Sequence, residues 1–308
     1  MKKRPGNLIT RRQALFSLSA LTASAFINPS ILLADVAPHP RHTFAVIGDW
    51  GSGDKEEFEL AKKMFEVYQK TPYECVLTVG DNIYPDGNPN LITKKFEQPF
   101  ADLLSASVPF YAALGNHDVE KGREAQTNYP LFNMGGKNYY VINKCDGLVD
   151  FFMLDSTTFD ERQKDWLEKN LSESQAKWKM AFFHHPLYSS GKKHGPQEEL
   201  RKILEPIFVK YGVKVVFQGH DHFYERLNIQ NGIQYFVTGG GGKLRKGGLD
   251  LKSGMRAASF DLDNHFMFIE INEKEFTFKA ISRTGSIVDE GVVKKVLNAQ
   301  AQTAGTSL

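Results

Sequence analysis

Short apolar segments alternate with amphipathic ones through the first two thirds of the chain. The apolar segments, four or five residues long and rich in β-branched and aromatic residues, predict buried strands, and the amphipathic segments repeat apolar residues at helical spacing. The predicted strands are 43–47, 75–79, 110–114, 139–143, 151–154, 179–183 and 213–217, and the predicted helices are 55–70, 91–105, 162–171 and 198–211. The polar, glycine-rich region 122–138 predicts a long loop.

The pattern changes after the last predicted helix. Residues 226–230 and 234–238 flank Asn231-Gly232, a strong hairpin signal, and further strands without helices run to Val296. Alternating strands and helices followed by strands alone predict an α/β fold: a layered α-β-β-α sandwich of two mixed sheets flanked by helices.

The first 37 residues have the character of an export leader. Five basic residues within the first twelve positions precede an apolar, small-residue run over 14–25, which is short and Ser/Thr-rich for a membrane span. Residues 10–16, with Arg11-Arg12, resemble a twin-arginine signal, and a chance arginine pair in an ordinary signal is the alternative. We therefore expect an exported, periplasmic or secreted protein with a leader at 1–37, a catalytic domain at 38–298 and a flexible tail at 299–308.

Charge and cysteine content narrow the possible partners. The chain has 38 basic and 36 acidic residues, and residues 1–37 hold five of the basic and one of the acidic, which leaves 33 and 35. Because this remainder is slightly acidic and has no basic run, we expect no nucleic-acid surface.

Cys75 and Cys145 can form one disulfide but cannot by themselves form a thiolate metal site, and a buried free thiol at Cys75 is equally compatible with the sequence.

Polar motifs follow five of the predicted strands, and four of them contain glycine. A single Gly-Asp after a strand is typical of a turn, but the repetition indicates a site at the carboxyl edge of a sheet. The candidate metal ligands, all with oxygen or nitrogen donors, are Asp49, Asp81, Tyr84, Asn116, His184, His220 and His222. Such donors suit iron, manganese or zinc. Seven groups exceed the needs of one ion, so we predict two ions that share a carboxylate.

In this order, the motifs Gly-Asp, Gly-Asp-x-x-Tyr, Gly-Asn-His-Asp, His and Gly-His-x-His resemble those of the calcineurin-like metallophosphoesterases. Tyr84 narrows the resemblance to the purple acid phosphatases, of which the small, tartrate-resistant type is most similar; the resemblance covers residues 44–272. It implies the metallophosphoesterase fold and an acid phosphatase that hydrolyses phosphate monoesters by metal-activated hydroxide. The alternatives are a phosphodiesterase or nucleotide-specific hydrolase on the same fold, and a non-catalytic phosphate-binding protein, which would be expected to have lost ligands.

The resemblance also implies a role for each candidate residue. The ligands of a ferric ion would be Asp49, Asp81, Tyr84 and His222. The ligands of a divalent ion (Fe, Zn or Mn) would be Asp81, Asn116, His184 and His220. His117 would stabilise phosphate charge and His194 would protonate the leaving oxygen; an exposed loop histidine is the alternative for His194. We expect a monomer that acts on a phosphorylated small molecule or phosphoprotein.

Overall fold

Two mixed β-sheets form the centre of the structure, a computed structural model that describes residues 41–294. The first sheet has six strands in the order β13-β12-β11-β1-β2-β3. Its strands are β1 (His42–Ile47), β2 (Val76–Thr78), β3 (Phe110–Tyr111), β11 (His265–Ile271), β12 (Glu275–Ser282) and β13 (Ile287–Lys294). β1, β2 and β3 are parallel, and β11 joins them antiparallel to β1.

The second sheet has seven strands in the order β10-β8-β9-β7-β6-β5-β4. Its strands are β4 (Tyr140–Lys144), β5 (Val149–Met153), β6 (Trp178–Phe182), β7 (Val215–Gln218), β8 (Tyr224–Leu227), β9 (Gln234–Thr238) and β10 (Arg256–Phe260). β5, β6, β7 and β9 are parallel neighbours. β8 and β9 form the predicted antiparallel hairpin, with Asn231 and Gly232 both at positive φ in its turn.

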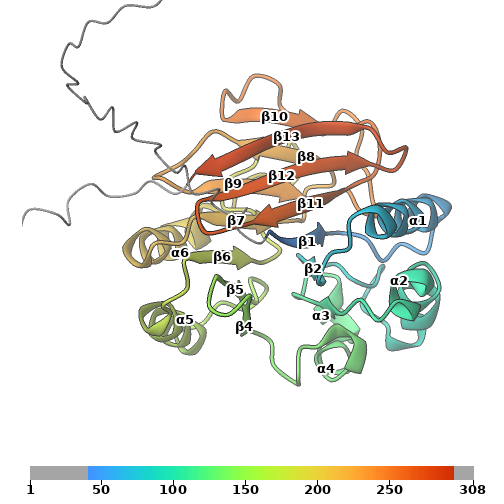
Figure 1. Ribbon diagram of the computed structural model, residues 1–308, viewed down its shortest axis with the longest axis horizontal. Helices are drawn as coiled ribbons and strands as arrows, with labels where there is room; N and C mark the ends of the chain where they lie inside the picture. Colours follow the sequence, from blue (N-terminus) through green and yellow to red (C-terminus); the bar gives the residue numbers. More distant parts are fainter. Residues whose placement is uncertain (1–40, 295–308) are drawn as a thin grey trace, which may run out of the picture. The chain divides into compact units, whose positions relative to one another are not determined.

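The sheets face each other across an aromatic core. Phe44 of β1 meets Phe151 of β5 with ring centroids 5.0 Å apart, and Phe236 of β9 meets Phe278 of β12 at 4.8 Å. Figure 1 shows helices on both sides of the two sheets. The helices are α1 (Lys55–Lys70), α2 (Ala101–Ser105), α3 (Asp118–Lys121), α4 (Arg123–Thr127), α5 (Glu161–Glu173) and α6 (Glu198–Tyr211). This arrangement confirms the predicted layered α-β-β-α sandwich.

One predicted helix is wrong as a continuous element. In place of a helix over 91–105, the structure has a 3-10 turn that ends at Leu91 (Pro89–Leu91), a π-helical turn at Thr93–Glu97 and the short α2. Pro99 has no N–H for helical bonding, and the changes of pitch place two buried rings against Trp50. The Phe96 and Phe100 centroids lie 5.5 and 5.2 Å from that of Trp50. Tertiary packing therefore overrides the helical pattern here.

The predicted loop at 122–138 is also partly wrong. α4 follows α3 directly, and a 3-10 turn spans Pro130–Phe132. Polar side chains, not an apolar stripe, anchor these short helices: Asp118, Gln126 and Thr127 are buried. A reading based on hydrophobic periodicity has no signal for helices of this kind.

The other boundaries of the chain stay predictions. The described residues lie inside the expected catalytic domain at 38–298, whereas the leader at 1–37 and the tail at 299–308 lie outside the described residues. Within residues 41–294, no helix has the length and apolar character needed to cross a bilayer.

Candidate metal centre

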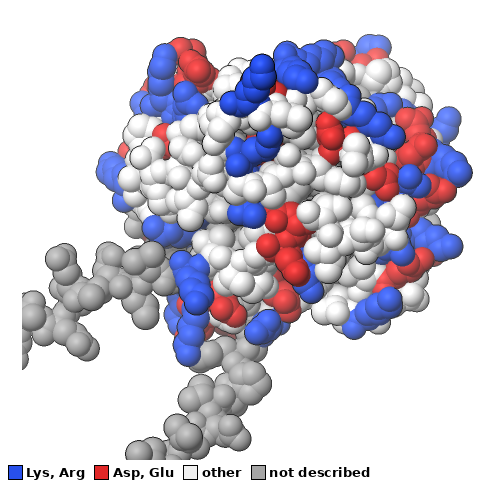
Figure 2. Space-filling view, turned by 90° about the horizontal axis from the view of Figure 1, so that it is seen from above, with Lys and Arg blue, Asp and Glu red and all other residues white. Residues whose placement is uncertain are grey.

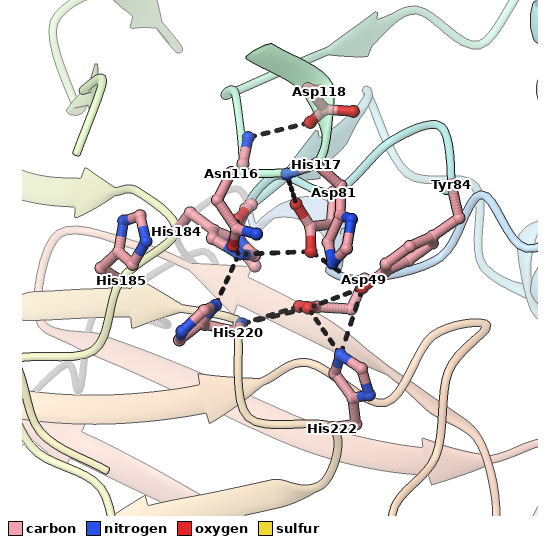
Figure 3. Close-up of polar contacts among 12 residues, drawn as sticks. Asp49, Asp81, Tyr84, Asn116, His117, Asp118, His184, His185, His220 and His222 are labelled. Carbon is pink, nitrogen blue, oxygen red and sulfur yellow. Dashed lines mark hydrogen bonds and ion pairs between the residues drawn. The ribbon is translucent and has the colours of Figure 1, made fainter. Parts of the chain in front are cut away.

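The seven predicted ligands meet at one edge of the two sheets (Figure 3). Asp49 follows β1, and Asp81 and Tyr84 follow β2. Asn116 lies in the connection after β3. On the second sheet, His184 follows β6, and His220 and His222 follow β7. Because all these strands are parallel within their own sheet, their carboxyl ends deliver the side chains to a common place.

Three of these residues have left-handed backbone conformations. The φ angles are +53° at Asp49, +52° at Asp81 and +70° at His220. Non-glycine residues adopt this region at a cost of about 1–3 kcal/mol each, and such residues cluster at functional sites. The chain thus turns sharply after β1, β2 and β7.

The first group of donors surrounds the phenol oxygen of Tyr84. This oxygen lies 3.1 Å from Asp49 Oδ1, 2.9 Å from Asp81 Oδ2 and 3.2 Å from His222 Nε2. The phenol has one proton to donate to these atoms. The donor atoms of Asp49, Asp81 and His222 lie within 4.8 Å of one another, close enough to hold one metal ion.

The second group surrounds Nε2 of His184. This nitrogen lies 3.0 Å from Asn116 Oδ1, 3.1 Å from His220 Nδ1 and 3.4 Å from Asp81 Oδ2. The other ring nitrogen, Nδ1, is 3.0 Å from the carbonyl oxygen of Val79, which fixes the ring so that Nε2 points into the group. Asp81 belongs to both groups.

Buried charges of opposite sign stabilise the centre. Asp49 and His184 are fully buried, and Asp81 is 1% exposed. Burial opposes ionisation of His184, yet the charges of Asp81 and Asp49 raise its pKa to about 10. Burial likewise opposes ionisation of Asp81, but His184 holds the pKa of Asp81 well below its usual range. Burial, together with Asp49 and Asp81, raises the pKa of Tyr84 well above its ordinary value.

These observations fit a pair of cations. Around Tyr84 and around His184, oxygen and nitrogen donor atoms converge, and a cation at either place would take the position of the phenol proton or of the Nε2 proton of His184. Burial and the charge of His184 lower the pKa of His220 to about 2, and the neutral imidazole is the form that binds a metal. Two clusters of hard and borderline donors with one carboxylate in common are typical of a binuclear site.

The two predicted outer residues lie beside the clusters. His117 donates its backbone N–H to Asp81 Oδ1 at 3.0 Å, and its ring centroid is 4.7 Å from that of Tyr84. The His194 ring lies 4.1 Å from the His220 ring. Burial, with the charges of Arg245 and Lys193, lowers the pKa of His194 to about 4. The loop that carries His194 thus folds back to the centre.

Asp118 is a supporting residue to which sequence reasoning gave no role. It is fully buried and accepts backbone N–H groups of Asn82, Ile83 and Gly115 at 2.8–3.0 Å. It thereby joins the turn after β2 to the turn after β3, the turns that carry Asp81 and Asn116. Its place at the end of Gly-Asn-His-Asp was the available signal.

Asp221 and Arg245 were also missed. Asp221 lies between two predicted ligands but accepts from Ser189 Oγ at 2.6 Å and from Gly195 N at 3.2 Å, so it anchors the loop of His194. Arg245 follows the Gly239–Gly242 run and donates its backbone N–H to the carbonyl of His222 at 2.9 Å. Its Nη1 is buried with no hydrogen-bond partner among residues 41–294.

The fold and the centre define a member of a known class. Residues 42–224 match the family of calcineurin-like phosphoesterases, and the chain belongs to that family. The chain is 32% identical over 239 residues to purple acid phosphatase 3 of Arabidopsis thaliana, covering 67% of this chain and 64% of that protein. It is 28% identical over 316 residues to human tartrate-resistant acid phosphatase type 5, covering 86% of this chain and 94% of that protein.

Solved structures agree on the fold. The purple acid phosphatase PPD1 of yellow lupin superposes with a TM-score of 0.70 at 19% identity, covering 83% of this chain and 54% of that chain. GAP50, described as the anchor in the inner membrane complex of Plasmodium, superposes with a TM-score of 0.73 at 20% identity, covering 82% of this chain and 89% of that chain. These structures support the fold alone. The family match and the sequence relatives confirm the predicted resemblance to purple acid phosphatases and the predicted class of enzyme, a metal-dependent phosphoesterase.

Proposed function

We propose that this protein is an acid phosphatase that hydrolyses phosphate monoesters at a binuclear metal centre. The observation that carries the proposal is the pair of donor clusters that share Asp81 at the carboxyl edge of both sheets. The similarity to acid phosphatases from plants and mammals supports it.

The two clusters would hold different ions. The proposed ligands of a ferric ion are Asp49, Asp81, Tyr84 and His222. The proposed ligands of a divalent iron, zinc or manganese ion are Asp81, Asn116, His184 and His220. The phenol oxygen of Tyr84, a hard anionic donor once it has lost its proton, favours the ferric ion in this cluster. When bound, such ions supply Lewis acidity: they draw charge from phosphate oxygens and lower the pKa of water.

The side chains around the clusters would bind the substrate and move its proton. His117 is placed to donate to a phosphate oxygen, and the unpartnered Nη1 of Arg245 adds a cationic donor on the His194 side. His194 would protonate the leaving oxygen as water attacks phosphorus. A phosphate anion beside His194 would raise its pKa from about 4, so acidic medium would favour its protonated form.

The test compares a nitrophenyl phosphate monoester with a bis-nitrophenyl phosphate diester, using purified metal-loaded protein in mildly acidic buffer. We expect a higher kcat/KM for the monoester and the loss of both activities in Asp81→Asn. A higher kcat/KM for the diester would refute the proposal and show that the protein is a phosphodiesterase on the same fold. Full activity of Asp81→Asn would overturn the assignment of the site.

We also propose that the protein is exported, through the folded-protein route, to the periplasm or medium. The support is the sequence of residues 1–37, with Arg11-Arg12 before an apolar run. Replacing both arginines by lysine should trap unprocessed, active phosphatase in the cytoplasm. Normal export of that variant would show that the leader is of another kind.

The proposed substrates are phosphorylated small molecules or phosphoproteins, bound by a monomer. On the face shown in Figure 2, basic and acidic side chains are interspersed, as the near balance of charge in the chain would lead one to expect. This mixture supports a small anionic substrate better than a long polyanion, which needs an extended basic surface.

A further inference from the structure

A second set of mixed donors lies at the opposite end of the strands from the catalytic centre. His42 is the first residue of β1, Glu74 lies just before β2, and Cys145 follows β4. His42 Nδ1 is 2.6 Å from Glu74 Oε1, and Cys145 Sγ is 3.8 Å from both carboxylate oxygens of Glu74. The donor atoms of the three residues all lie within 4.8 Å of one another.

We propose that His42, Glu74 and Cys145 form a separate binding site for one zinc-like divalent ion, and that this ion joins the two sheets. Thiolate, imidazole and carboxylate are the donors that zinc prefers, and three protein ligands leave a fourth position for water. The two sides of the site belong to different layers, because His42 and Glu74 precede strands of the first sheet and Cys145 lies in the turn between β4 and β5 of the second.

The present distances are close to those of a tetrahedral ion. Zinc bonds of about 2.0–2.3 Å at tetrahedral angles place neighbouring donor atoms about 3.3–3.5 Å apart. The sulfur-to-carboxylate distance of 3.8 Å is near this value, and the His42–Glu74 pair must open by about 0.7 Å from 2.6 Å to match it. His42 and Cys145 are partly exposed and Glu74 is exposed, so small rotations of these side chains are available.

The site is independent of the catalytic centre. β1 has six residues, so its first and last residues are about 17 Å apart at about 3.3 Å per residue, and Asp49 lies beyond the far end. Sulfur also distinguishes the two places, because every proposed catalytic ligand has an oxygen or nitrogen donor. Cys75 and Cys145 do not form a disulfide, which leaves the Cys145 sulfur available.

The experiment uses this difference in donors. Purified full-length protein, kept reduced without added thiols, is titrated with Co²⁺, and thiolate-to-cobalt charge-transfer absorption is recorded in the near ultraviolet. We expect one thiolate-bound cobalt per chain in the wild type, no such band in Cys145→Ser, and a retained band in the matched control Cys75→Ala. Absence of the band from the wild type, or its persistence in Cys145→Ser, would overturn the proposal.

A second variant does not depend on the cysteines. Mutating a residue that only hydrogen-bonds to a metal ligand lowers metal affinity about 10–100-fold. Glu74 is a proposed ligand itself, so Glu74→Gln should weaken cobalt binding at the thiolate by about tenfold or more. Glu74 is exposed, and the change should leave the phosphatase activity unaltered. An unchanged affinity in Glu74→Gln would remove the carboxylate from the site and refute the proposed ligand set.

The role in joining the sheets has its own measurement. Zinc that binds the folded protein alone raises its melting temperature. We expect this rise in the wild type and a smaller one in Cys145→Ser, since any contribution from the catalytic centre is common to both proteins. Equal rises would show that zinc does not connect the sheets through Cys145.

Discussion

Replacing His265 by glutamine should make the fold less sensitive to acid. His265 is the first residue of β11 and is fully buried. Its Nε2 lies 3.0 Å from Thr238 Oγ1, and its Nδ1 has no hydrogen-bond partner within the described part of the chain. Because burial disfavours the charged ring, the pKa of His265 falls to about 3.

The size of the effect follows from proton linkage. In the unfolded chain a histidine has a pKa of about 6.5, so between that value and about pH 3 the unfolded state binds a proton that the folded state does not. The stability that neutral His265 contributes is therefore complete above pH 6.5 and is lost as the pH falls through this window. Since pH 5 lies about 1.5 units below the pKa of the unfolded histidine, the unfolding free energy lost at pH 5 is about 2 kcal/mol.

Urea unfolding at pH 8 and pH 5 measures this loss. Glutamine can still hydrogen-bond to Thr238 but does not titrate, so we expect the unfolding free energy of His265→Gln to fall by about 2 kcal/mol less than that of the wild type. Both proteins are compared in the same metal state, so the other titrating groups cancel in the difference. An equal fall in both proteins would refute a neutral, buried His265.

Three further predictions concern the centre. Tyr84→Phe should remove the visible charge-transfer band of a ferric phenolate while the circular dichroism stays unchanged; a wild type that is colourless, active and fully loaded with zinc would exclude iron. His194→Ala should slow hydrolysis of an alkyl phosphate by about 10²–10⁴-fold and of a nitrophenyl phosphate much less, because nitrophenolate leaves without a proton. Equal, small losses of rate on both substrates at unchanged metal content would show that His194 is an exposed loop residue without a role in proton transfer. Asp118→Asn should lower the unfolding free energy by about 1–3 kcal/mol, since the amide NH₂ faces buried backbone donors, and a urea midpoint equal to that of the wild type would contradict this.

The fold and the site were predictable where a helix or strand carries its own signal. α1 begins and ends where the sequence pattern placed it, although the buried face of the helix is formed by Leu60, Ala61 and Met64, and Phe58, which contributed to the pattern, is 39% exposed. The candidate ligands were recognisable because each follows an apolar run, and parallel strands in a layered fold bring such positions to one edge.

The remaining features depend on contacts between distant segments. The position of His194 is set by Asp221, 27 residues later in the chain, through its bond to Gly195. Arg245 reaches the centre through the carbonyl of His222. Neither contact leaves a periodic pattern in the sequence. The same is true of the short helices α3 and α4, which depend on buried hydrogen bonds instead of an apolar face.

The glycines before the ligands have a physical meaning that local turn preference does not supply. A Cβ atom on Gly115 would lie 2.1 Å from Asp81 Oδ1, and one on Gly219 would lie 2.4 Å from Asp49 Oδ2. Neither of these two glycines has positive φ, whereas Gly80, directly before Asp81, has a φ of +92°, a conformation that favours glycine. At positions 115 and 219 glycine is required because the backbone of one turn touches the carboxylate of another. The glycines in these turns are thus explained by how closely the strand ends approach one another. The same close approach lets one carboxylate, Asp81, belong to both donor clusters.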